Sequence, residues 1–118
     1  ISRIAEFVIE TDTALMQAFP GIRLVDFGHL GDGNLHYNVQ APVGVAAADF
    51  VRDNERAVNT LVYDAVERHG GSISAEHGIG ALKRDELARR KSPEAMALMR
   101  AIKAALDPEG RMNPGRVL

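Results

Sequence analysis

The sequence contains no cysteine among its 118 residues, and this absence limits the chemistry open to the chain. Disulfide bonds and thiolate metal sites are excluded, so any metal ion must be bound by His, Asp, Glu or Asn side chains. Positive charge is not in excess either, because the net charge at pH 7 is -2. We therefore expect no nucleic-acid partner. No apolar run approaches the roughly 18 residues that a membrane-spanning helix requires.

Apolar residues at helical spacing occupy most of the chain. The spacing predicts a helix from residue 1 to Pro20, a second over 47–71 that stops at Gly70 or Gly71, and a short helix over 81–91. Ser92 and Pro93 are typical of a helix start, and a final helix should follow them. The residues expected to face inward are Ile1, Ile4, Phe7, Val8, Leu15, Met16, Phe19, Phe50, Val51, Val58, Leu61, Val62, Ala65, Val66, Met96, Met99, Ile102 and Leu106.

Two strands joined as a hairpin over 24–39, and a β-like segment over 71–80, complete the predicted elements. This order indicates an α+β fold with a partial ferredoxin-like antiparallel sheet, helices on one face and further helices at the C-terminus. The first strand of a ferredoxin-like sheet is missing, and a helix begins at residue 1 without an initiator Met. We therefore expect residues 1–118 to be the C-terminal part of a longer protein.

The segment "FGHLGDGNLHYNV" places two histidines on either side of an Asp-Gly pair, the strongest short-range signal for a two-residue hairpin turn. A turn at Asp32 and Gly33 would set His29 directly opposite His36, with Cβ atoms roughly 4.5–5.5 Å apart. Both imidazoles would then lie on one face with Asn38, and the other, apolar face would pack on helices. Such a pair predicts a site for a zinc-like metal ion, although the pattern also fits a hairpin whose histidines are solvated.

A third candidate ligand, Glu76, lies beside another histidine in "SAEHGIG". One carboxylate and two imidazoles leave an open coordination position, which is typical of catalytic metal sites. Strict alternation would place only one of Glu76 and His77 in the site, but a backbone that turns at Gly78 and Gly80 would admit both. One would act as ligand and the other as base. The alternative is a solvated strand end.

Three motifs together resemble one protein family. They are "GHLGDGNLHYNV", "GGSISAEHGIGALKR" and "DPEGRMNPGRVL", in this order along the chain. They are similar to the C-terminal domain of FAD-linked 2-hydroxyacid dehydrogenases, which include D-lactate dehydrogenases, the glycolate oxidase flavoprotein subunit and D-2-hydroxyglutarate dehydrogenase, within the vanillyl-alcohol oxidase superfamily. The resemblance covers nearly all of the chain from residue 24 onward.

The resemblance implies a role for each candidate residue. His29, His36 and Glu76 would bind a divalent metal ion such as zinc, Asn38 would contact the substrate, and His77 would accept the hydroxyl proton. Asn113, in the terminal "NPG", would lie near the flavin. The family's FAD is bound by an N-terminal domain, and nothing in residues 1–118 resembles that domain.

The expected substrate is a small 2-hydroxy acid, and the electron acceptor is left undefined. We expect a cytoplasmic protein, which could meet its electron acceptor at a membrane surface, and the sequence leaves a homo-oligomer open. Two other functions fit the same residues. A stand-alone metallohydrolase would use the two histidines and Glu76 with a bound water, and a non-catalytic ferredoxin-like module would bind a ligand without metal.

Overall fold

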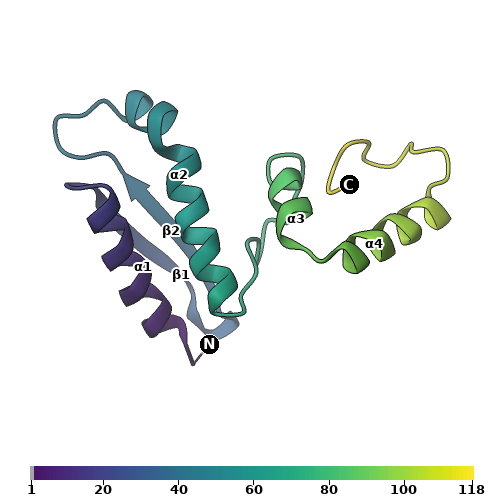
Figure 1. Ribbon diagram of the computed structural model, residues 1–118, viewed down its shortest axis with the longest axis horizontal. Coiled ribbons are helices and arrows are strands. Elements are labelled where there is room, and N and C mark those ends of the chain that lie inside the picture. Colours follow the sequence, from purple (N-terminus) through teal and green to yellow (C-terminus); the bar gives the residue numbers. More distant parts are fainter. Residues whose placement is uncertain (1) are drawn as a thin grey trace. The chain divides into compact units, whose positions relative to one another are not determined.

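The computed structural model describes residues 2–118 and divides into two compact units (Figure 1). The first unit ends at Glu76, and the second comprises His77–Leu118. The expected inward position of Ile1 lies outside the described residues. None of the helices in the described part of the chain is long and apolar enough to cross a membrane. The elements are α1 (Ile4–Ala18), β1 (Arg23–His29), the 3-10 turn η1 (Leu30–Asp32), β2 (Asn34–Gln40), α2 (Ala47–Arg68), α3 (Arg84–Arg90) and α4 (Pro93–Leu106).

The core of the first unit lies between the β1–β2 hairpin and the two helices α1 and α2, which cover the same face of the hairpin (Figure 1). Leu15 of α1, Ile22 and Val58 of α2 are buried at its centre. The side chains packed around them are Phe19, Leu24, Tyr37, Val39, Phe50, Leu61 and Val62. The α+β class and the helix-covered face are therefore confirmed. Met16 and Val51, expected to face inward, are about half exposed.

The hairpin register differs from the predicted one by two residues. His29 pairs with Asn34, and His36 pairs with Phe27, so the expectation that the two histidines lie directly opposite each other is wrong. Their common face is confirmed, because side chains alternate along both strands and a shift of two residues preserves the alternation. The histidines are diagonal neighbours on the face away from the helices.

The turn explains the shift in register. A two-residue Asp-Gly turn requires positive φ at both positions, and that conformation is costly for Asp32. In the structure only Gly33 adopts it, with φ of 73°, and its backbone N–H donates to the carbonyl of Leu30 at 3.1 Å. The four residues of this loop replace the predicted two. Both numbers are even, so each side chain stays on its predicted face.

The predicted β-like segment over 71–80 is wrong, because residues 71–80 form neither strand nor bridge. Gly78 and Gly80 adopt left-handed φ values of 73° and 59°, which interrupt an extended ladder. Ser72 also closes a local turn, since its hydroxyl donates to the carbonyl of Ser74 and accepts from the Ser74 N–H. Such local bonds compete with strand pairing. In the described part of the chain the sheet is the β1–β2 pair.

The second unit contains α3, α4 and the turn-rich tail. Ser92 caps α4 as predicted, because its hydroxyl accepts a hydrogen bond from the Ala95 N–H at 3.2 Å. Met96 is buried, but Ile102 and Leu106 are exposed, so their predicted inward positions are wrong. Lys103 occupies the inward side of the last turn instead, where its ammonium group contacts Asp107 and the Met112 carbonyl.

A polar cluster lies between α1 and the helix-facing side of the hairpin. The Tyr37 hydroxyl donates to Asp12, and burial together with this bond raises the pKa of Tyr37. Burial raises the pKa of Asp26 to about 6, and the charge of Asp12 and a hydrogen bond to it contribute further. One oxygen of Asp26 is buried without a hydrogen-bond partner. Asp26 therefore holds a proton more readily than an ordinary carboxyl group does.

Replacing Asp26 with Asn should stabilise the chain at pH 7.5 and have little effect near pH 3.5. The pKa of Asp26 is raised in the folded state, from an ordinary value of 3.8 to about 6. Its contribution to stability is therefore complete below pH 3.8 and is lost as the pH rises through about 6. The full shift is equivalent to about 3 kcal/mol, which solvent around the half-buried carboxyl reduces to about 1 kcal/mol.

Urea denaturation of the 118-residue chain between pH 3.5 and 8 measures this effect. Asp85→Asn is the matched control, because the Asp85 side chain is 94% exposed. If Asp26→Asn and Asp85→Asn change the stability equally at pH 7.5, the carboxyl pair does not carry the assigned pH dependence.

Candidate metal centre

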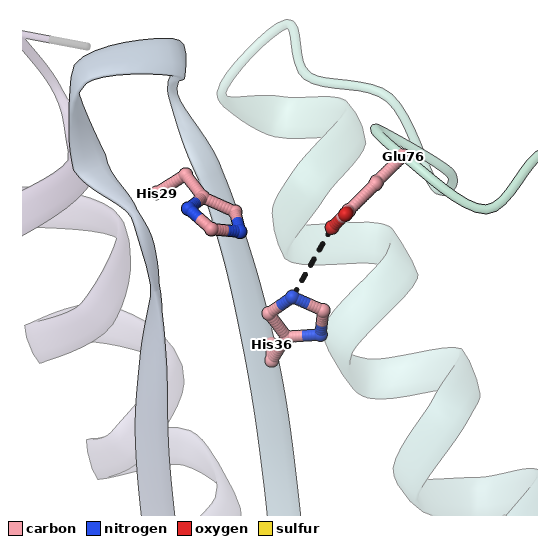
Figure 2. A group of neighbouring side chains, drawn as sticks. All are labelled: His29, His36 and Glu76. Carbon is pink, nitrogen blue, oxygen red and sulfur yellow. Dashed lines mark ion pairs between the residues drawn. The ribbon is translucent and has the colours of Figure 1, made fainter.

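The two histidines of the hairpin and a carboxylate from the following loop form the candidate site (Figure 2). His29 ends β1 and is exposed, whereas His36 lies within β2 and its side chain is 29% exposed. Glu76 reaches them from the segment that follows α2. This helix ends at Arg68, and Gly70, with φ of 69°, turns the chain at its end. All three residues belong to the first unit.

The distances in the cluster fit a metal ion. One ligand atom of each residue lies within 4.8 Å of the others. Two ligand atoms bound tetrahedrally to one zinc ion at 2.0–2.1 Å lie about 3.3 Å apart. The 3.2 Å between His36 Nε2 and Glu76 Oε2 agrees with this spacing. A small movement of the exposed His29 side chain would complete a three-ligand set with an open fourth position.

An aromatic contact fixes the plane of one imidazole. The Phe27 ring stacks on His36 with centroids 5.1 Å apart and an angle of 18° between the planes. The edge of the His36 ring that carries Nε2 is directed toward Glu76, as Figure 2 shows. His29 is inclined to His36 by 74°, with ring centroids 6.2 Å apart. The stacking therefore restricts His36 while His29 keeps more freedom.

Asn38 lies on the same face of the hairpin as the histidines, as predicted. Its side-chain amide donates to the carbonyls of Val25 and His36 at 3.1 and 3.2 Å. These bonds orient the amide group, and Asn38 remains exposed. Asn38 therefore lies beside His36, at the edge of the candidate ligand cluster. The predicted contact with substrate stays a prediction.

His77 and Asn113 belong to the second unit. His77 is exposed and follows Glu76 directly in the chain, so the two residues stay neighbours through the peptide bond. Asn113 is exposed in the tail and adopts a left-handed φ of 46°, a conformation that Asn tolerates better than most residues. Its carbonyl accepts a hydrogen bond from the Arg116 N–H at 3.2 Å. The roles expected of both residues stay predictions.

Asn34, to which the sequence motifs assigned no role, contacts the cluster directly. Its side-chain amide donates to Glu76 Oε2 at 2.8 Å, and the residue is 8% exposed. The alternation of side chains placed Asn34 on the histidine face, so this signal was present. The partner, Glu76, is 42 positions away along the chain, and local patterns do not reveal such a pairing.

Residues 1–117 match a family model described as FAD linked oxidases, C-terminal domain. The chain belongs to this family. It is also 47% identical over 117 residues to a D-2-hydroxyglutarate dehydrogenase of Xanthomonas citri pv. viticola, a match that covers 99% of the chain and 25% of the relative. The family of FAD-linked oxidase C-terminal domains is the one that the three sequence motifs resemble.

Other relatives carry the same name. A D-2-hydroxyglutarate dehydrogenase of Stutzerimonas stutzeri is 40% identical over 99% of the chain and 25% of that protein. The mitochondrial D-2-hydroxyglutarate dehydrogenase of Rattus norvegicus is 39% identical over the whole chain and 21% of its own length. The chain therefore spans about a quarter of the length of these curated relatives.

Replacing Gly28 with Ala should disrupt the hairpin next to His29. A Cβ atom at Gly28 would lie 2.3 Å from the Asn34 carbonyl oxygen and 2.9 Å from the Leu35 Cα. Both are backbone atoms of the paired strand, so the strands would have to separate. We expect a loss of about 2–3 kcal/mol in the free energy of unfolding, as for other overpacked sites.

Gly31→Ala is the matched control, because a Cβ atom there would meet nothing within 4 Å. We expect this change to alter stability by about 0.5 kcal/mol or less. Chemical denaturation of the two variants provides the comparison. Equal stabilities would mean that the close approach at Gly28 does not constrain the hairpin.

Proposed function

We propose that the chain is the substrate-binding C-terminal domain of an FAD-dependent dehydrogenase that oxidises a small 2-hydroxy acid. The observation that carries the proposal is the convergence of His29, His36 and Glu76 within 4.8 Å in a member of the FAD-linked oxidase family. Relatives named D-2-hydroxyglutarate dehydrogenase make that acid the first candidate substrate, ahead of D-lactate and glycolate. FAD would be bound mainly by an N-terminal domain that precedes these 118 residues.

A divalent ion, with zinc as the first candidate, would be held by the two imidazoles and the carboxylate. When bound, it would supply a Lewis acid that lowers the pKa of a substrate hydroxyl group. Because the chain supplies only three ligands in this cluster, the ion would keep capacity to bind an oxygen of a 2-hydroxy acid. The donor set of two nitrogens and one oxygen suits zinc, copper, iron or nickel better than calcium.

His77 would act as the proton acceptor in this proposal. An imidazole is suited to this role near neutral pH, and His77 is joined by a peptide bond to the proposed ligand Glu76. Asn38 would orient the substrate with its side-chain amide. This amide lies on the hairpin face that carries His29 and His36, which we call the ligand face. Bound FAD would supply the acceptor for the hydrogen on the substrate's α-carbon. Asn113 would lie near the flavin.

The two other functions receive less support. Membership of the FAD-linked oxidase family favours a flavoenzyme over a stand-alone metallohydrolase and over a ligand-binding module without metal. Purification of the full-length protein, followed by measurement of flavin content and of dye reduction with D-2-hydroxyglutarate, D-lactate and glycolate, tests this choice. A protein without flavin that hydrolyses esters or amides would support the metallohydrolase instead.

We also propose a cytoplasmic location, whereas the rat relative is named mitochondrial.

Replacing His36 with Ala in the full-length protein should weaken zinc binding and reduce turnover by at least about 100-fold, because a three-ligand site loses one ligand. FAD content should be unchanged. His36 is on the face of the hairpin away from the core, so we expect a stability change of about 1 kcal/mol or less. Zinc titration of the metal-free protein, flavin absorbance and steady-state kinetics measure the three quantities.

Gln40→Ala is the matched control, because Gln40 is exposed on the same strand and the same face as His36. It should leave zinc affinity and turnover unchanged. If His36→Ala keeps wild-type turnover after exhaustive chelation, the metal role assigned to the cluster is wrong. His77 acting alone as base would then be the remaining mechanism.

A further inference from the structure

The side chain of Asn34 is nearly buried at the first position of β2, on the ligand face of the hairpin. Its amide donates to Glu76 Oε2 at 2.8 Å, and the same oxygen lies 3.2 Å from His36 Nε2. Two groups from one strand therefore converge on one carboxylate oxygen. They approach it from residues 34 and 36, which alternation places on the same side of β2.

Glu76 depends on such contacts because its own backbone provides little support. It lies in a segment without helix or strand, and its side chain is 45% exposed. A long, exposed glutamate side chain populates many rotamers, and ordering it as a ligand costs conformational entropy. A hydrogen bond from a rigid partner removes much of that freedom before a metal ion arrives.

Asn34 is such a rigid partner. The two strands approach closely here, since a Cβ atom added at Gly28 would lie 2.3 Å from the Asn34 carbonyl oxygen. Asn34 also pairs with His29 across the hairpin, so its backbone is fixed beside one proposed ligand. A nearly buried amide without a partner would be costly, and the bond to Glu76 satisfies one of its donors.

We propose that Asn34 is a positioning residue that holds the Glu76 carboxylate in the ligand cluster, so that metal affinity depends on Asn34 through Glu76. The inference rests on the proposed function, because it assumes that the cluster binds a divalent ion. It adds a residue outside the ligand set to the determinants of metal binding. The inference also predicts that the side chains of Asn34 and Glu76 contribute to metal affinity as one unit.

A double-mutant cycle in the full-length protein tests this coupling. The variants are Asn34→Ala, Glu76→Ala and the double variant, each made metal-free and titrated with Zn²⁺. We expect Asn34→Ala to weaken Zn²⁺ binding about 10- to 100-fold, as outer partners of metal ligands do. In the Glu76→Ala background, the same change should have almost no further effect, because its target is gone.

Two additional variants separate positioning from folding. Asn34→Leu keeps most of the side-chain volume but removes the donor, and it should weaken Zn²⁺ binding as Asn34→Ala does. Asn54→Ala is the control, because Asn54 is also partly buried and its amide donates to a backbone carbonyl of α2, that of Phe50. It should leave Zn²⁺ affinity unchanged. Thermal denaturation of the metal-free variants, read beside the titrations, reports the structural effect.

The possible outcomes distinguish the two proposals. Wild-type Zn²⁺ affinity in both Asn34 variants, or an equal loss with and without Glu76, would overturn the positioning role. A lowered melting temperature with unchanged Zn²⁺ affinity would indicate a structural role alone, and it would also overturn the inference while the metal site stands. A wild-type protein that binds no Zn²⁺ would overturn the metal role of the cluster and, with it, the positioning role of Asn34, while the proposed dehydrogenase function would be judged by the flavin and dye-reduction assays.

Discussion

The alternation of side chains along the β1–β2 hairpin is the constraint on which the rest of the first unit depends. Leu24, Tyr37 and Val39 face α1 and α2, and this contact supplies the core that a two-stranded sheet needs for stability. The residues that alternate with them along the strands face the other way. His36 and Asn38 therefore point away from the core because of the same strand pairing that builds the core. A one-residue slip would exchange the two faces and destroy both core and site together. The apolar core therefore fixes which face of the hairpin carries the histidines.

This coupling explains why the candidate site could be predicted although the register was not. The Asp-Gly pair indicated the hairpin, and alternation then placed His29 and His36 on one face whether the loop has two residues or four. The choice of loop depends on the conformation that Asp32 adopts, which the pattern does not fix. Glu76 was predicted as a ligand because it lies beside His77 in the sequence and because its carboxylate can join two imidazoles in a catalytic metal site. Its hydrogen bond to Asn34 joins residues 42 positions apart and required the tertiary structure.

Elsewhere the predictions failed where local and tertiary forces compete. The segment over 71–80 has apolar and β-branched residues, but left-handed glycines and the local turn at Ser72 prevent strand pairing. In α4 the spacing of Ile102 and Leu106 suggested an inward stripe, whereas the tail is held through Lys103 on a different side of the helix. The cap at Ser92 was predictable because it depends on residues within three positions.

The polar cluster on the helix-facing side has a different consequence from the ligand face. Asp26 and Tyr37 pair across the strands and interact with Asp12 of α1, and burial beside Asp12 raises the pKa of Asp26. On the opposite face, the histidines must be unprotonated to bind a metal ion. Lower pH thus favours the protonated carboxyl of Asp26 on one face and opposes metal binding on the other. One pair of strands therefore carries two groups of residues with opposite preferences. Asp26 contributes more to stability as the pH falls, whereas the proposed metal ligands bind a metal ion better as the pH rises.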